Sequence, residues 1–156
     1  MTNPYQLCES IGRRATEELF GNYYIFKFTA DEYNRVDFLA TGLTLSYPTY
    51  VGEIKQYNQE RRLRKFENYM IDYNKLEAII QKANEQGRIP ILICYFTDFT
   101  VVWNLNKIGL QTLYERAEWR HVNKDGQNYG AEKENSFVTY LYENEAVWIR
   151  TTKQAS

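Results

Sequence analysis

Tyr50-Val51-Gly52-Glu53-Ile54-Lys55 is the stretch that decides how this chain folds. It lies in a β-rich segment, and we expect a strand over residues 49–57. Side chains alternate between the two faces of a strand, so Glu53 and Lys55 are expected to lie on the same face. Such a pair can be a surface ion pair, or it can belong to a site that holds a divalent cation beside a water-activating lysine.

Two more strands are expected upstream, over residues 23–29 and 35–40, and turn-forming residues connect them. Asp37 falls in the second of these strands, between Val36 and Phe38. Aspartate is disfavoured in strands, so its presence there needs an explanation. Asp37 is either a surface acid near a turn or the carboxylate partner of the Glu-x-Lys pair.

The chain should begin with an amphipathic helix that ends at Gly21-Asn22. Its apolar stripe is formed by residues at three- and four-residue steps: Cys8, Ile11, Ala15 and Leu19. At about 100° per residue, Glu18 lies at the edge of this stripe and can face a sheet, whereas Glu17 faces solvent.

A long helix is expected over residues 59–86, where apolar residues keep helical spacing until Gly87. The nearly continuous apolar run 89–96 predicts a strand covered on both faces, and residues 99–105 predict its hairpin partner. Further along, we expect a short helix within 110–120 and a polar surface loop over 124–136.

Residues 137–142 and 146–152 predict a closing β-hairpin. The sequence contains no internal repeat, low-complexity tract or linker, so residues 1–156 are expected to form a single domain.

The charge of the chain restricts how it can meet a nucleic acid. Nineteen Lys and Arg face 20 Asp and Glu, giving a net charge of −1. A nucleic-acid partner would therefore be met by a local basic patch or through a metal ion. The single histidine, His121, excludes sites built from several histidines, and a Gly-rich phosphate loop is absent. Apolar surroundings favour buried, inert thiols for Cys8 and Cys94.

The first residues lack an apolar signal segment, and no run approaches the roughly 20 apolar residues of a membrane span. We therefore expect a cytoplasmic protein without a membrane partner.

The order of helix, three strands, long helix and strand resembles the PD-(D/E)XK nuclease superfamily over roughly residues 5–97. Asp37 in the second strand and Glu53 and Lys55 in the third strand carry the resemblance, with Glu18 as a fourth residue. Val36 stands where the family has proline, and the Gln-x-x-x-Tyr signature of some members is absent. The implied fold is α/β, a restriction endonuclease-like core with an extra C-terminal β-hairpin region.

The resemblance implies a Mg²⁺- or Mn²⁺-dependent phosphodiester hydrolase, in the first place a DNA endonuclease, with RNA as an open alternative. Asp37, Glu53 and the backbone carbonyl of Ile54 would bind the metal. Lys55 would position or deprotonate the attacking water, and Glu18 would support the site. Small nucleases of this class often act as dimers, so a homodimer is an expectation too.

Substrate binding needs positive charge, and a basic run stands at the start of the expected long helix: Arg61, Arg62, Arg64 and Lys65. These residues, with Arg35 beside Asp37, would contact phosphates without reading sequence. The run can equally be an ordinary charged helix start. The alternative function is a catalytically inactive nuclease-like module that binds nucleic acid or a protein partner.

Overall fold

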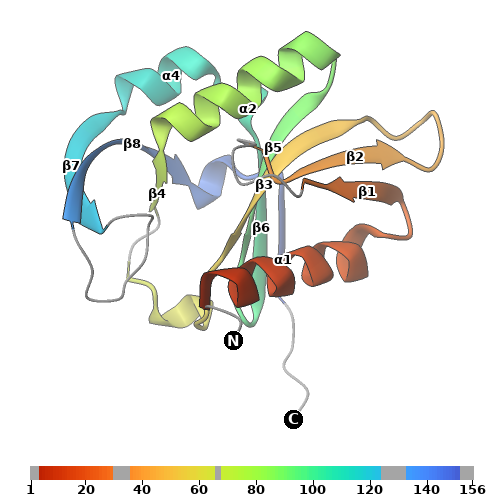
Figure 1. Cartoon of the computed structure of the whole chain (residues 1–156), viewed down its shortest axis with the longest axis horizontal. Coiled ribbons are helices and arrows are strands. Elements are labelled where there is room, and N and C mark those ends of the chain that lie inside the picture. Colours follow the sequence, from red (N-terminus) through yellow and green to blue (C-terminus); the bar gives the residue numbers. More distant parts are fainter. Residues whose placement is uncertain (1–3, 30–35, 66–67, 124–132, 152–156) are drawn as a thin grey trace.

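The computed structural model describes residues 4–29, 36–65, 68–123 and 133–151, which form two β-sheets with flanking helices (Figure 1). The larger sheet has the order β1 (Tyr24–Phe28), β2 (Phe38–Gly42), β3 (Tyr50–Gln56), β5 (Ile89–Tyr95), β6 (Phe99–Asn104) and β9 (Trp148–Thr151). The smaller sheet has the order β4 (Asn68–Asp72), β8 (Lys133–Tyr142) and β7 (Glu118–Asn123).

Strand β3 organises the larger sheet. It closes an antiparallel meander with β1 and β2, and on its other side it pairs in parallel with β5. Parallel neighbours need a crossover, and this one contains the short 3-10 turn η1 (Arg61–Leu63), β4 and helix α2 (Tyr73–Gln86). Strand β6 then returns antiparallel to β5, as expected. The expected order of helix, three-strand meander, helix and strand is therefore confirmed.

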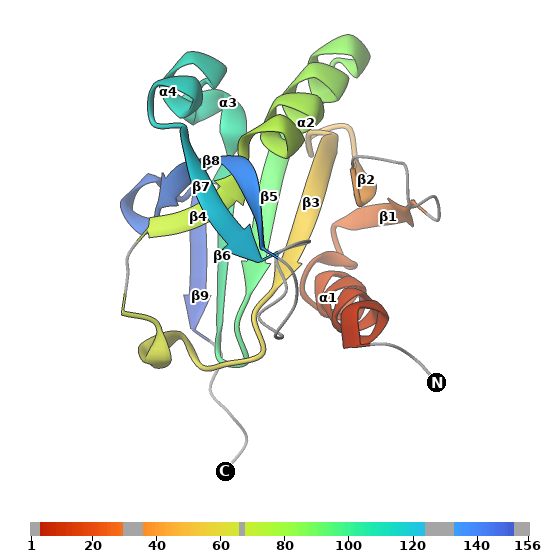
Figure 2. The same cartoon turned by 60° about the vertical axis from the view of Figure 1, so that its left-hand side comes forward.

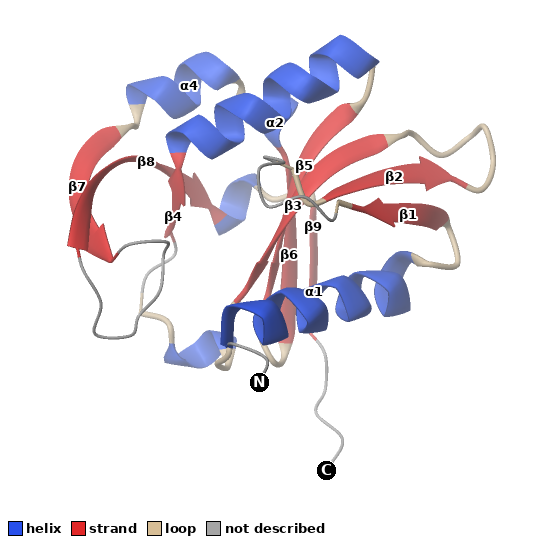
Figure 3. Ribbon diagram, in the orientation of Figure 1, coloured by secondary structure: helices blue, strands red, loops and turns tan. Residues whose placement is uncertain are grey.

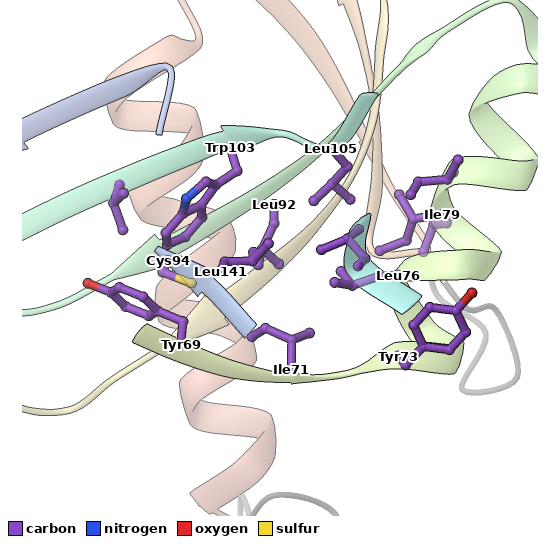
Figure 4. Close-up of a cluster of buried hydrophobic side chains, with 14 of the residues drawn as sticks. Tyr69, Ile71, Tyr73, Leu76, Ile79, Leu92, Cys94, Trp103, Leu105 and Leu141 are labelled. Carbon is purple, nitrogen blue, oxygen red and sulfur yellow. The ribbon is translucent and has the colours of Figure 1, made fainter. Parts of the chain in front are cut away.

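Helix α1 (Pro4–Phe20) and helix α2 cover opposite faces of this sheet (Figure 1, Figure 2). On the α2 face, Val51, Leu92 and Trp103 pack against α2 and the smaller sheet. Figure 4 shows this cluster, in which Cys94 is buried as expected. On the other face, Phe38 and Ile93 pack against α1. None of the helices in the described ranges is long and apolar enough to cross a membrane.

Helix α1 presents only part of the expected stripe to the sheet: Ala15 and Leu19 pack there as expected, but Ile11 does not. Gly12 and Thr16 are buried, whereas Ile11 is 42% exposed. The helix lies so close to β3 that a Cβ at Gly12 would come within 2.7 Å of the Ile54 side chain. Thr16 also hydrogen-bonds the Tyr95 hydroxyl at 2.7 Å. The Cys8 side chain lies outside the described residues.

The prediction of a single long helix over residues 59–86 is wrong, because only the second half of this range forms helix α2. Asp72 caps α2 by accepting a hydrogen bond from the Lys75 amide at 3.0 Å, and Gly87 ends the helix with φ 63°. Before Asp72, the chain forms β4, which pairs with β8 from the far end of the sequence. Tyr69 and Ile71 are buried and alternate with less buried residues, so they follow a strand period.

The expected closing hairpin is also wrong. Strand β8 pairs with β4 and β7, whereas β9 pairs with β6 in the other sheet (Figure 3). The short 3-10 turn η3 (Glu143–Glu145) lies between them. The region expected to contain a short helix forms α4 (Leu110–Glu115), preceded by α3 (Leu105–Ile108) and followed by β7. Residues 133–136 of the expected loop belong to β8, and residues 124–132 lie outside the described ranges.

Candidate active site

Asp37 is held at the point where β2 begins. Its amide donates to the Gly52 carbonyl at 2.9 Å, and its own carbonyl accepts from the Thr29 amide at 2.9 Å. Its side chain reaches β3, where Oδ2 accepts a hydrogen bond from the Ile54 amide at 2.8 Å. Both the backbone and the carboxylate of Asp37 are therefore fixed against the central strand.

Glu53 lies on the α2 face of β3, and its side chain is 9% exposed. Burial raises the pKa of the Glu53 carboxyl to about 8; Lys75 opposes this rise, and the adjacent Asp37 carboxyl adds to it. The Asp37 carboxyl lies close enough to Glu53 to disfavour a second negative charge there. The structure thus brings together the two carboxylates that the sequence predicted as a pair.

The cation beside this pair is one that the sequence analysis missed. Lys75, in the first turn of α2, forms an ion pair with Glu53 Oε1. Its position follows from Asp72, whose side chain caps the helix at the Lys75 amide. The Asp72 cap was the available signal, because aspartate is a favoured residue at a helix start. The expected helix beginning at residue 59 concealed it.

Lys55 shares the α2 face with Glu53, as strand alternation predicted, but its amine turns toward β4. Its Nζ donates to the Met70 carbonyl at 3.5 Å and lies 5.7 Å from the centre of the Tyr57 ring. Burial lowers the pKa of Lys55; the Cys94 thiol opposes this change, and Lys75 adds to it. A lysine with a lowered pKa is more often neutral near pH 7 than one in water, so it is more often able to accept a proton.

The backbone of Ile54 faces the edge where Asp37 lies. The Gly52 carbonyl accepts a hydrogen bond from the Asp37 amide, on the β2 side. The Thr49 carbonyl accepts from the Ile89 amide and the Tyr57 amide donates to the Tyr95 carbonyl, both on the β5 side. Hydrogen-bonding direction alternates along a strand, so residue 54, like residue 52, points toward β2. The Ile54 carbonyl therefore shares an edge with the Asp37 carboxylate, which is compatible with its predicted role as a third oxygen ligand.

The carboxylate pair fits a divalent cation. Glu53 Oε2 is buried and has no hydrogen-bond partner among the described residues. Ionised carboxylates are acceptors only, so a proton or a cation is needed between two that touch. The described part of the chain contains no group of three or more His, Cys, Asp and Glu side chains placed to hold a metal. Two carboxylates are nevertheless the usual protein contribution to a Mg²⁺ site that also binds substrate phosphate.

The structure does not bring Glu18 to this site. Its side chain is 69% exposed and pairs with Arg14 at 3.3 Å on the helix surface. Helix α1 covers the face of the sheet opposite to Glu53 and Lys55. The expected orientation depended on an apolar stripe through Ile11, whereas the buried face of the helix runs through Gly12 and Thr16.

The basic run is not at a helix start, and its arginines make contacts within the chain. Arg61 pairs with Glu143, and Arg62 pairs with Glu60. The Arg64 guanidinium lies 4.3 Å from the centre of the Tyr69 ring and donates to the Asn68 carbonyl at 2.7 Å. These contacts hold the connection between β3 and β4, and the phosphate contacts expected of this run stay a prediction. Lys65 is exposed, and Arg35 lies outside the described residues.

No family model matches the sequence, and no curated protein matches it significantly. Among solved structures, the chain is similar to Archaeoglobus fulgidus Hjc, a Holliday junction resolvase from an archaeal hyperthermophile. The identity is 10%, the TM-score is 0.49, and the match covers 85% of this chain and 88% of that chain. At this level of similarity, the function of this chain has to be inferred from its own residues.

Proposed function

We propose that this chain is a metal-dependent phosphodiester hydrolase, and that it acts on DNA as an endonuclease using Mg²⁺ or Mn²⁺. The observation that carries the proposal is the convergence of the Asp37 and Glu53 carboxyls on the central strand, with two lysines beside them. A buried acid such as Glu53 beside a second, half-buried acid is costly to keep charged without a compensating cation. Such sites are typical of catalytic centres rather than of structural ion pairs.

Asp37 and Glu53 would hold the ion, and the Ile54 carbonyl is compatible with a third ligand. When bound, the ion supplies an activated water and offsets the charge that develops on the phosphate. Lys55 Nζ, whose pKa is lowered by burial, would orient that water and take its proton. Asp37 has a positioning role as well, because it holds the Ile54 amide at the edge of the site.

Calorimetric titration with Mn²⁺ and cleavage assays on linear, branched and single-stranded DNA test this proposal. Wild type should bind Mn²⁺ and cleave at least one substrate. Asp37→Asn should lose both properties, and Lys55→Ala should lose cleavage while retaining Mn²⁺ binding. Glu18→Gln is the matched control and should behave as wild type, because that carboxylate is exposed on the other face. Equal cleavage by wild type and Lys55→Ala would contradict the assigned role of Lys55.

A second candidate is an inactive nuclease-like module that binds nucleic acid or a protein partner. Its support is the Lys75–Glu53 ion pair, because an ammonium group can take the place of a metal ion beside one carboxylate. The same titration separates the two candidates, since the module would show no Mn²⁺ binding that depends on Asp37. A homodimer would place one site on each of the two DNA strands. Analytical ultracentrifugation measures whether the chain is a monomer or a dimer.

A further inference from the structure

We propose that Lys75 contacts a substrate phosphate. In the metal-free protein, its ammonium group would instead stay paired with the Glu53 carboxylate until a divalent ion takes its place. This inference rests on the proposed function, because it assumes that Asp37 and Glu53 bind the ion. It assigns to helix α2 a residue of the site that the strand pattern does not contain.

Lys75 reaches Glu53 from the solvent side. Its side chain is 40% exposed, whereas the Glu53 side chain at the other end of the ion pair is 9% exposed. The backbone of Lys75 is fixed, because its amide is held by the Asp72 cap at 3.0 Å. Beyond that point, the four-carbon stem of Lys75 is flexible. In the conformation seen here, its ammonium group pairs with Glu53. Rotation about the bonds of this side chain would carry the ammonium outward while the start of α2 stays in place.

Lys55 cannot make the same movement. Its amine contacts the Met70 carbonyl of β4, and its charge is desolvated. Its stem begins at the centre of the larger sheet, where β3 lies between β2 and β5. The two lysines thus stand on different sides of Glu53. We assign Lys55 to the interior of the site and Lys75, whose side chain is partly exposed, to its solvent side.

A divalent ion and the Lys75 ammonium would compete for the same carboxylate. Both are cations, and the charge of one near the other is unfavourable in a place with little water. Binding of the ion would therefore displace the ammonium toward solvent. Asp37 and Glu53, which would hold the ion, come from the β2–β3 region, so Lys75 is the cation that approaches them from α2 on the solvent side. Lysine is a strong point-charge partner for phosphate, so the displaced ammonium would meet the substrate there.

The test is a pair of affinities that should change in opposite directions in Lys75→Met. Calorimetry without nucleic acid measures Mn²⁺ binding, which should become severalfold tighter because the competing ammonium is gone. Fluorescence anisotropy of a labelled DNA in Ca²⁺ measures substrate binding, which should become weaker. The slope of DNA affinity against salt should fall by about 1, as expected for one lost phosphate contact. Lys75→Arg keeps the charge and should retain most of the DNA affinity.

Lys107→Met, on the exposed surface of α3, is the matched control and should change neither affinity. If Lys75→Met is poorly folded, Lys75→Gln provides the same test, because it removes the charge and keeps a polar group beside Glu53. Mn²⁺ binding by Lys75→Gln that is unchanged or weaker than in wild type would overturn the inference, as would unchanged DNA affinity. Absence of Mn²⁺ binding in wild type would instead overturn the proposed function itself.

Discussion

Glu53 carries the main electrostatic conflict among the described residues of the site. Its carboxyl is buried beside the Asp37 carboxyl, and the Lys75 ammonium relieves only part of the cost of its charge. The pKa of the Glu53 carboxyl is about 8 in the folded protein, above its value of about 4.3 in the unfolded chain. The folded state therefore holds a proton that the unfolded state releases. This contribution to stability is complete below the unfolded pKa and is lost as the pH rises through the folded pKa.

Glu53→Gln should remove this pH dependence. We expect the free energy of unfolding of wild type to fall between about pH 5 and pH 9 by an amount on the order of a few kcal/mol. The glutamine variant has no charge to bury, so its stability should change less over the same range. Urea denaturation at a series of pH values measures both slopes, with Glu18→Gln as an exposed control. Parallel slopes for wild type and Glu53→Gln would show that burial does not raise the pKa of Glu53 in the folded protein.

The sequence predicted the strand residues of the site and missed the helical one. Glu53 and Lys55 share a face because strand alternation depends on spacing alone. Asp37 was paired with them because an aspartate is unusual inside a strand, but β2 begins only at Phe38, so Asp37 lies one residue before the strand that was expected to contain it. Lys75 could not be found in this way, since its contact with Glu53 depends on where α2 begins. That start depends on a pairing of β4 with a strand near the other end of the chain.

At the scale of the elements, Gly12 sets how closely α1 approaches β3. A methyl group at this position would come within 2.7 Å of Ile54 Cγ2. Alanine is the better helix former, yet here Gly12→Ala should lower the free energy of unfolding by about 1–3 kcal/mol through overpacking. Denaturant melts of Gly12→Ala and of Ser10→Ala, whose side chain is exposed, make the comparison. A stabilised Gly12→Ala would indicate that the helix can shift without cost.

The connection between β3 and β4 should respond to mutation as a structural element. Arg61 and Tyr69 both bind Glu143, which lies in η3 at the far end of the chain. Arg61→Gln should lower the free energy of unfolding by about 1–3 kcal/mol, because it leaves a partly buried carboxylate less well paired. Arg62→Gln is the control, since Arg62 is exposed and pairs with its neighbour Glu60. Chemical denaturation should separate the two variants, and a larger effect of Arg62→Gln would argue against this role.

Elements formed by neighbouring residues were predictable, and elements formed by distant pairing were not. The meander and the β5–β6 hairpin follow from local turns and apolar runs. The segment before Asp72 has apolar residues whose spacing suits a helix as well as a strand. Only its pairing with β8 decides between them. The same distant pairing takes β8 away from β9, which is why the expected closing hairpin does not form.

At the scale of the whole molecule, the two sheets share one hydrophobic core. Tyr69 of β4 and Trp103 of β6 pack edge to face with ring centres 4.8 Å apart. The Trp103 indole donates to the Tyr142 carbonyl at 2.8 Å, at the end of β8. Leu141 of β8 is buried in the same cluster as Leu92 of β5 (Figure 4). The C-terminal third of the chain therefore completes the core on which the site is built.

A chain ending at residue 109 tests whether the nuclease-like part can fold alone. It would keep α1, the meander, α2, β5 and β6, but β4 would lose its pairing with β8 and Trp103 would lose its cover. We expect this chain to lack a cooperative thermal transition by circular dichroism and to bind a hydrophobic dye, because large apolar surfaces become exposed. The full chain should show a single transition by tryptophan fluorescence and by circular dichroism. A cooperative transition of the shortened chain near the midpoint of the full chain would instead mean that residues 110–156 are a separate unit, and that the site does not depend on them.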